Sequence, residues 1–238
     1  MGVSRVVNNH PLYGRPLPVT HSGLIVGGGV SGMTAAPEMA GQGFDVYLVE
    51  RENQLGGNAN HIHSTLRNER VQDVLREMIA KIRADSHITV YTNAVLKRVD
   101  GFVGNFHTVL EQAGNGSGPT EIALDHGVII VATGGEERPT HSYLYGQDPR
   151  VVTQRELEES LADGGFTFPE GRPGTVVMIQ CVDSRNDENP YCSRVCCSQA
   201  IKNAIALKKR YPDSNVYILY RIYAPMACAK GSISRLAN

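Results

Sequence analysis

The sequence is nearly uncharged overall, and it contains neither a long apolar run nor an apolar stretch near its start. Its 23 Lys and Arg residues balance 24 Asp and Glu residues, which leaves a formal net charge of -1 and no reason to expect a nucleic-acid partner. A membrane-spanning helix needs about 18–20 consecutive apolar residues, and a secretory signal needs an apolar core. The sequence offers neither, so we expect a cytoplasmic protein without membrane or nucleic-acid contacts.

A glycine-rich turn follows the short apolar run at residues 24–26, which predicts a buried strand. Gly27, Gly29 and Gly32 have the G-x-G-x-x-G spacing of dinucleotide-binding folds. In that motif the first glycine permits the tight turn, the second lets a pyrophosphate approach, and the third lets the helix pack on the strand. Pro37 lies inside the expected helix, where it should end or kink the helix.

The segment DVYLVE predicts a second strand, and it ends in Glu50, eighteen residues after Gly32. An acidic side chain at this distance typically bonds the ribose 2′-hydroxyl of a dinucleotide. A glycine-rich turn without a ligand would leave both the second strand and the acid unexplained. The pattern therefore predicts a dinucleotide site.

Two further segments, ENQLGGNAN after Glu50 and GVIIVATGG at 127–135, resemble those of the two-dinucleotide-binding-domain flavoproteins, the thioredoxin reductase-like group. In that group the first module holds FAD, and the Ala-Thr-Gly turn lies close to it. The resemblance favours FAD over NAD. The predicted cofactor-binding residues are Gly27, Gly28, Gly29, Ser31, Gly32, Glu50, Arg51, Gly57, Asn58, Ala132, Thr133 and Gly134.

Between these motifs, apolar residues at helical spacing predict a helix over 69–85. The segment from 88 to 112 predicts strands, with Gly101 and Gly104 marking a turn. His61 and His63 alternate as they would on a strand, and surface or flavin-side packing explains them better than a bound metal.

A joint rich in glycine and proline at 163–174 precedes a second strand–loop–helix–strand pattern. We expect a strand in TVVMIQCV, a helix over 198–211 and a strand over 215–221. The loop of this second Rossmann-like unit carries cysteines where phosphate-binding glycines would stand. It should therefore not bind NAD(P) in the usual way.

The cysteines of this loop, Cys181, Cys192, Cys196 and Cys197, have the spacing C-x10-C-x3-C-C. Four thiolates suit an iron–sulfur cluster or a structural zinc ion, although adjacent cysteines are awkward for a zinc knuckle. A redox disulfide and buried, reduced cysteines are the alternatives. A reducing compartment disfavours a structural disulfide.

The segment VVMIQCVDSRNDENPYCSRVCCSQAIKNAIALKKRYPDSNVYILYR resembles the flavin- and iron–sulfur-bearing subunit of heterodisulfide reductase, as do GGGVSGMTAA, GGNANHIHSTL, VDGFVGNFHT and PTHSYLYGQDPRVVTQRELEE. The resemblance covers roughly residues 18–221. It implies FAD in the first module and a 4Fe-4S cluster held by the four cysteines. It also implies electron transfer toward disulfide reduction. The implied partners are the other heterodisulfide reductase subunits and an electron-donating protein, such as a hydrogenase or formate dehydrogenase subunit.

Some features of that family are missing from the sequence, among them the ferredoxin-like C-x2-C-x2-C-x3-C-P runs. The segment after 222 does not resemble the family, and Cys228 within it is given no role. We therefore expect a truncated or fragmentary member. The alternatives are a pyridine nucleotide–disulfide oxidoreductase with a redox cysteine pair and a nonfunctional FAD-domain remnant.

Together these patterns predict an α/β chain, with a Rossmann-like FAD/NAD(P)-binding fold followed by a partial second Rossmann-like unit. The predicted parts are a leader over 1–22, an FAD-binding domain over 23–145, the second unit over 146–222 and an unmatched tail over 223–238.

Overall fold

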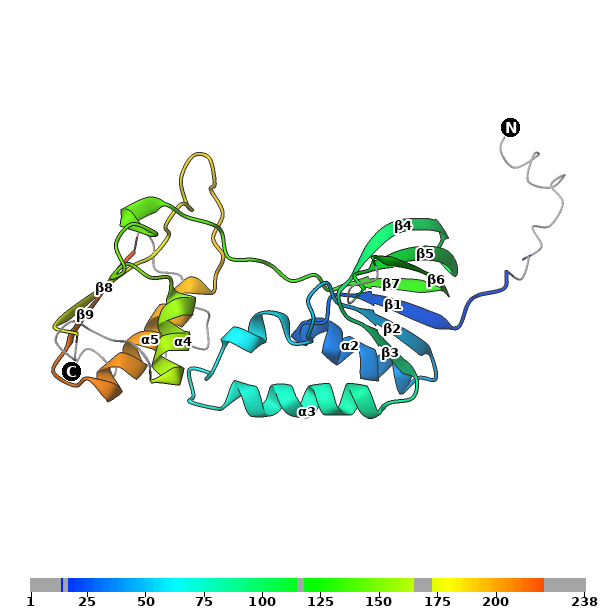
Figure 1. Cartoon of the computed structure of the whole chain (residues 1–238), viewed down its shortest axis with the longest axis horizontal. Coiled ribbons are helices and arrows are strands. Elements are labelled where there is room, and N and C mark those ends of the chain that lie inside the picture. The colour runs from blue at the N-terminus through cyan, green and yellow to red at the C-terminus, as the bar shows by residue number, and fades with distance from the viewer. Residues whose placement is uncertain (1–13, 15–16, 115–117, 165–172, 221–238) are drawn as a thin grey trace, which may run out of the picture.

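A computed structural model describes residues 14, 17–114, 118–164 and 173–220. Most of the predicted leader and joint, and the whole tail with Cys228, lie outside these residues. Figure 1 shows two units joined by an extended segment, a larger unit formed by the first half of the chain and a smaller one formed by the second half.

A four-stranded parallel sheet forms the centre of the first unit. Its strands are β1 (Ser22–Val26), β2 (Asp45–Val49), β3 (Ile88–Tyr91) and β7 (Val128–Val131), in the order β3-β2-β1-β7. In the register of the two central pairs, Ile25 lies beside Leu48 on one side and Ile130 on the other. The strands predicted at 24–26 and in DVYLVE are confirmed.

Helices α2 (Val30–Ala40) and α3 (Val71–Ala84) cover one face of this sheet. The buried side chains of Ile25, Leu48 and Met33 meet Ile82 of α3 in one hydrophobic cluster. Helix α3 confirms the helix predicted over 69–85, and its apolar stripe faces the sheet.

An antiparallel meander covers the other face of the sheet (Figure 1). It consists of β4 (Ala94–Phe102), β5 (Asn105–Gln112) and β6 (Thr120–His126). Leu110 and Leu124 of the meander pack with Leu24 of β1 in a second cluster. Of the two glycines predicted to mark a turn, Gly104 lies between β4 and β5, whereas Gly101 lies inside β4 with a φ of 96°.

Pro37 does not end helix α2, which continues to Ala40. The proline ring removes the N–H that would bond the carbonyl of Met33. The next turn still closes normally, because the N–H of Gly41 donates to the carbonyl oxygen of Pro37 at 2.8 Å. An early helix end at Pro37 is therefore wrong.

The second unit contains α4 (Gln154–Asp163), β8 (Thr175–Ile179), α5 (Cys196–Arg210) and β9 (Asn215–Leu219). Strands β8 and β9 pair in parallel, and α5 connects them, which confirms the predicted strand–loop–helix–strand pattern. Their inner side chains pack with Leu157 of α4 and Leu207 of α5. Helix α5 begins two residues before the predicted start at 198.

Helix α4 has no counterpart in the sequence predictions, although its start and end carry recognisable signals. The Thr153 hydroxyl accepts from the Glu156 N–H while the Glu156 carboxylate accepts from the Thr153 N–H, a capping box. Gly164 ends the helix in the left-handed conformation, with a φ of 74°.

A short 3-10 turn, η2 (Ser142–Leu144), lies in the segment between the units. The Ser142 hydroxyl donates to the Asp183 carboxylate at 2.9 Å, so this turn contacts the second unit. The domain boundary at 145–146 stays a prediction. Among the described residues, no helix combines the length and the apolar character that a membrane crossing requires.

His126 is a buried side chain that connects the meander with the start of β7. Its burial predicts how the stability of the fold depends on pH. The side chain is 0% exposed, with its Nε2 at 2.8 Å from the Thr108 hydroxyl and its Nδ1 at 3.1 Å from the Val128 carbonyl. Burial lowers the pKa of His126 below the ordinary 6.5. The unfolded chain therefore binds this proton more readily, so stability should fall as the pH drops below 6.5.

Replacing His126 by Gln should weaken this loss of stability on acidification, because the amide does not titrate. Urea unfolding of the wild type and of His126→Gln at pH 7 and pH 5 would measure it. The exposed His87→Gln serves as the control for loss of an imidazole. If the stability of the wild type and of His126→Gln depended equally on pH, His126 would not be the group responsible.

Candidate functional site

The glycine-rich turn lies between β1 and α2, and two of its glycines are required by the fold. Gly27 has a φ of 112°, and a Cβ there would overlap the carbonyl oxygen of Ala132. A Cβ on Gly32 would overlap the carbonyl oxygen of Gly27. The backbone of the turn, the helix and the end of β7 therefore touch directly, as this motif requires.

Gly29 differs from these two glycines, because folding alone does not require it. Its φ of -76° suits any residue, and a Cβ would meet nothing within 4 Å. No side chain caps the start of α2 at this position. The open space at an uncapped helix N-terminus is the arrangement that binds phosphate groups.

Glu50 is buried directly after β2, and its carboxylate holds the glycine turn. Oε2 accepts the N–H of Gly28 at 2.7 Å, and Oε1 accepts the N–H of Glu52 at 2.9 Å. Each carboxylate oxygen can accept more than one hydrogen bond. The predicted ribose contact of Glu50 is compatible with this geometry and stays a prediction.

The loop after Glu50 returns to the glycine turn. The N–H of Gly56 donates to the carbonyl of Gly28 at 2.8 Å, and Gly57, with a φ of 52°, lies against Gly29. The Asn58 side chain donates to the carbonyl of Gly135 at 2.8 Å. The structure thus gathers the predicted residues of the glycine turn, the Glu50 loop and the Ala-Thr-Gly segment.

Some predicted cofactor residues lie at the edge of this group. Arg51 is exposed and pairs with Glu136 and Glu52, which joins the Glu50 loop to the segment after β7. Ser31, Thr133 and Gly134 are exposed. Their predicted contacts with a dinucleotide stay predictions.

The strand alternation predicted for His61 and His63 is wrong. His61 ends the 3-10 turn η1 (Gly57–His61), and its Nδ1 lies 2.6 Å from Oε1 of Glu159 in α4. The N–H of His63 donates to Oε1 of Glu158 at 2.9 Å. The segment therefore contacts the second unit.

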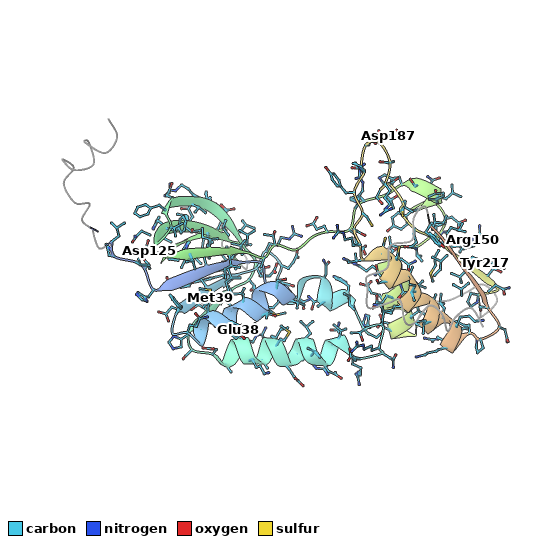
Figure 2. All side chains as sticks on the ribbon, turned by 180° about the vertical axis from the view of Figure 1, so that it is seen from behind. Glu38, Met39, Asp125, Arg150, Asp187 and Tyr217 are labelled. Atoms are coloured by element: carbon cyan, nitrogen blue, oxygen red, sulfur yellow. The ribbon has the colours of Figure 1, made fainter. Side chains whose placement is uncertain are left out.

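The cysteine loop between β8 and α5 has an unusual backbone. Four of its non-glycine residues have a positive φ, namely Cys181 at 60°, Asp183 at 51°, Arg185 at 56° and Arg194 at 63°. This conformation costs energy for residues with a Cβ and concentrates at functional sites. Figure 2 shows the loop projecting from the second unit, with Asp187 near its tip.

Cys192 lies in this loop next to hydrogen-bond donors. The N–H of Arg194 donates to its Sγ at 3.3 Å, and the Arg185 guanidinium lies beside the sulfur. The Arg194 N–H, together with Arg185, lowers the pKa of the Cys192 thiol despite partial burial. The loop therefore favours a thiolate at Cys192.

Cys196 and Cys197 form the first turn of α5, whereas the sequence placed the start of this helix after Cys197. Cys181 and Cys197 are buried, and Cys192 and Cys196 are half-buried. No disulfide joins any two of these four residues.

The four predicted cluster ligands are not gathered around a common centre. Across the described residues, no three His, Cys, Asp or Glu side chains are placed so that they could hold a metal ion. The arrangement thus does not fit a 4Fe-4S cluster as it stands. Two buried polar atoms that flank the loop nevertheless lack a hydrogen-bond partner: Nε2 of Gln180, directly after β8, and Oγ of Ser198, in the first turn of α5. The ligand set stays a prediction.

Three polar residues of α4 that contact the segment from Asn58 to His63 were not predicted from the sequence: Arg155, Glu158 and Glu159. Arg155 donates to the Asn58 side chain at 2.9 Å. The capping box at Thr153 could have revealed the helix that carries them.

The comparisons agree with this geometry. Residues 25–76 match the model of an NAD(P)-binding Rossmann-like domain. Bacillithiol disulfide reductase of Bacillus cereus superimposes over 91% of this chain and 64% of its own, with a TM-score of 0.54 and 17% identity. Thioredoxin reductase of Lactococcus lactis covers 84% of this chain and 64% of its own, with a TM-score of 0.51 and 14% identity. The fold is therefore the Rossmann-like FAD/NAD(P)-binding fold of the thioredoxin reductase-type flavoproteins.

Proteins with similar sequences point to one kind of protein within this class. The iron–sulfur subunit of a CoB–CoM heterodisulfide reductase from Methanopyrus kandleri is 29% identical over 87% of this chain and 44% of its own length. The corresponding subunits from other methanogens match similarly. The chain is a distant homologue of this heterodisulfide reductase subunit, and it spans less than half the length of these relatives. The alignment with this relative is 295 positions long, whereas this chain has 238 residues. The relative therefore carries residues inside the matched region that this chain lacks.

The contrast between Gly29 and Gly32 gives a matched pair of variants. Gly29→Ala should fold normally and lose dinucleotide affinity, because its methyl group points into open space that a phosphate would enter. Gly32→Ala should lose about 1–3 kcal/mol of stability, because its methyl group overlaps backbone. Thermal unfolding and titration with FAD measure both effects. Equal FAD affinity in Gly29→Ala and the wild type would argue against a pyrophosphate at this turn.

Proposed function

We propose that the chain is an FAD-binding oxidoreductase module of the heterodisulfide reductase type, which carries electrons toward disulfide reduction by partner subunits. The observation that supports it most is the open, uncapped helix start at Gly29, with Gly57 of the Glu50 loop lying beside it. The distant homology to the iron–sulfur subunit of heterodisulfide reductase points to the same class.

The residues of the first unit fit the ADP half of FAD. Gly29 and the start of α2 would receive the pyrophosphate, and the Glu50 carboxylate would receive the ribose hydroxyl. Bound FAD supplies the capacity to take up and release electrons. The chain itself orients the cofactor, since Glu50 fixes the turn and Gly57 closes over Gly29.

FAD is preferred to NAD for this site because of the two segments that resemble the thioredoxin reductase-like flavoproteins. The second unit should not bind NAD(P)H, because its loop between β8 and α5 carries cysteines rather than phosphate-binding glycines. Reducing equivalents would then come from a protein partner, such as a hydrogenase or formate dehydrogenase subunit. Assembly with further heterodisulfide reductase subunits and a cytoplasmic location belong to the same proposal.

The proposal includes a 4Fe-4S cluster in the cysteine loop of the second unit. Its four ligands, Cys181, Cys192, Cys196 and Cys197, would have to converge from positions that do not meet in the described loop. The strained backbone at Cys181 and the unpaired polar atoms of Gln180 and Ser198 favour a loop that receives a further group.

A thiol-based function is the second candidate, and the Cys192 environment favours it. The lowered pKa of that thiol would make Cys192 the more reactive partner of a cysteine pair. In that case the chain would resemble a pyridine nucleotide–disulfide oxidoreductase, in which two thiols cycle with a disulfide.

The purified chain should bind FAD, and NADH should not reduce the bound flavin rapidly. Both properties follow from a first unit with a glycine turn and a second unit without one. Equilibrium dialysis with FAD and stopped-flow absorbance with NADH measure them. If the chain bound no FAD, the proposal of an FAD-binding module would be wrong. Rapid reduction of the flavin by NADH would favour the pyridine nucleotide–disulfide oxidoreductase.

The cysteine set can be tested by anaerobic reconstitution with iron and sulfide. The cluster proposal expects about four irons per chain, with loss of the cluster in Cys192→Ala and Cys196→Ala. Iron counting and electron paramagnetic resonance measure it. Unchanged iron in these two variants would exclude them as ligands. A chain that takes up no iron but forms a reversible disulfide would support the thiol-based candidate.

A further inference from the structure

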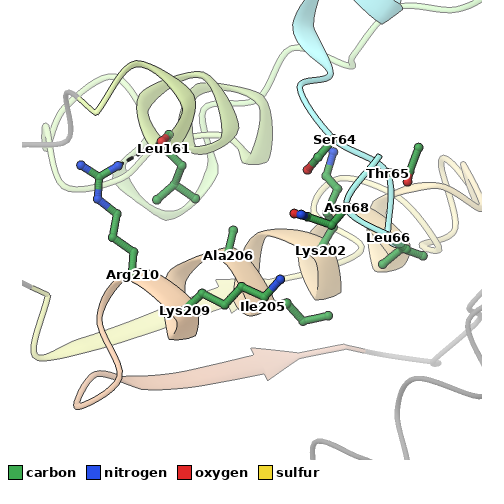
Figure 3. Close-up of a pocket in the computed structure, with 10 residues that line it drawn as sticks. All are labelled: Ser64, Thr65, Leu66, Asn68, Leu161, Lys202, Ile205, Ala206, Lys209 and Arg210. Carbon is green, nitrogen blue, oxygen red and sulfur yellow. Dashed lines mark hydrogen bonds between the residues drawn. The ribbon is translucent and has the colours of Figure 1, made fainter. Parts of the chain in front are cut away.

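In the part of the chain that the structure describes, the two units share no hydrophobic core. Each buried apolar cluster of the described residues lies within one unit. At the junction lies a cavity of about 360 Å³, with Ser64 and Thr65 of the first unit on one side and Leu161, Lys202 and Ile205 on the other (Figure 3). Units that meet over a polar, incompletely filled junction can move relative to each other unless specific contacts hold them.

Helix α4 provides polar contacts of this kind, and three of its residues reach the segment after Gly57, while Arg155 also lies 3.4 Å from Glu137. Arg155 donates to the Asn58 side chain at 2.9 Å, and Glu159 lies 2.6 Å from the ring nitrogen of His61. Glu158 accepts the N–H of His63 at 2.9 Å. The loop that closes over Gly29 is therefore connected, within a few residues, to α4.

Glu158 differs from the other contacts because it is buried and joins three segments. Its side chain is 5% exposed, and the same Oε1 that accepts the His63 N–H lies 2.5 Å from Nζ of Lys202, itself 12% exposed. Lys202 belongs to α5, the helix that begins with Cys196 and Cys197. Removing one member of a buried ion pair leaves the other charge without compensation.

The second oxygen of Glu158, Oε2, is buried without a hydrogen-bond partner. The carboxylate therefore depends on Oε1 for its stabilisation, and that atom is shared between the two units. Separating the units would remove the His63 N–H from Oε1 and leave the buried Glu158–Lys202 pair, which lies within the second unit, with one hydrogen-bond donor fewer.

We infer that Glu158 is a positioning residue that couples dinucleotide binding in the first unit to the docking of α5 and its cysteines. The identity of the ligand, FAD, rests on the proposed function. FAD stabilises the Gly57 loop, the loop presents the His63 N–H to Glu158, and Glu158 holds Lys202. Because such coupling is reciprocal, weakening the α4 contacts must also weaken FAD binding.

The test uses the full chain and compares Glu158→Ala, Glu158→Gln, Glu158→Gln with Lys202→Met, and the control Glu77→Gln. Glu77 is exposed on α3, so its replacement makes the same charge change away from the junction. FAD affinity is measured by fluorescence titration, below the unfolding temperature of every variant. Hydrogen–deuterium exchange of the 57–63 segment and of α5 is followed with and without FAD.

Glu158→Ala should weaken FAD binding by about tenfold, although Glu158 belongs to the other unit. Added FAD should protect α5 from exchange in the wild type and in Glu77→Gln, and not in Glu158→Ala. Adding Lys202→Met to Glu158→Gln should recover affinity relative to Glu158→Gln alone, because the amide still accepts from His63 and no buried charge remains. That recovery would show that the uncompensated Lys202 charge causes the loss of affinity in Glu158→Gln.

Unchanged FAD affinity together with persistent protection of α5 in Glu158→Ala would overturn the inference. If the wild type binds no FAD, the proposed function fails, and the coupling is judged on the ligand-free chain. Glu158→Ala must then raise exchange in both the 57–63 segment and α5 relative to Glu77→Gln. Exchange that rises in neither segment, or in only one, would overturn it.

Discussion

The buried carboxylate of Glu50 is the interaction on which the candidate site depends. It accepts backbone N–H groups from Gly28 and Glu52, so one side chain fixes both the glycine turn and the loop that follows β2. Hydrogen bonds to an ionised acceptor are stronger than neutral ones. The parallel sheet brings these turns together, because the carboxyl ends of β1, β2 and β7 lie at one edge. Glu50 then determines how the turns face one another, and the open space at Gly29 follows from that arrangement.

The sequence predicted the parts of the fold that have local signals. The glycine spacing, the apolar strands and Glu50 correspond to β1, β2 and the turn between them, and the apolar stripe corresponds to α3. Helix α4 was missed because its sequence contains few apolar residues. Its capping box was visible, yet the importance of Glu158 depends on His63 and Lys202, which are distant in sequence. The strand alternation of His61 and His63 failed because a 3-10 turn and contacts with α4 determine their conformation.

The cysteines show a different limit of sequence reasoning. Their spacing specifies how many thiols the loop offers, but not whether the side chains converge. Convergence depends on backbone angles, and Cys181 and Arg185 adopt left-handed conformations that the residue types do not predict.

The two units also differ in how fully their sheets are covered, since both faces of the first sheet are covered. The outer side chains of the β8–β9 pair, among them Val177 and Tyr217, are exposed, whereas parallel sheets are generally buried on both faces.

The three glycines of the turn are under different constraints, and this affects how related sequences should be interpreted. Gly27 and Gly32 are required by contacts within the chain, so a protein that has lost its cofactor but kept this fold would still retain them. Gly29 has no such requirement, and its retention in a lineage would reflect selection for a ligand. During divergence, a side chain at position 29 between two conserved glycines would therefore mark the point at which a descendant stopped using a dinucleotide while its architecture persisted.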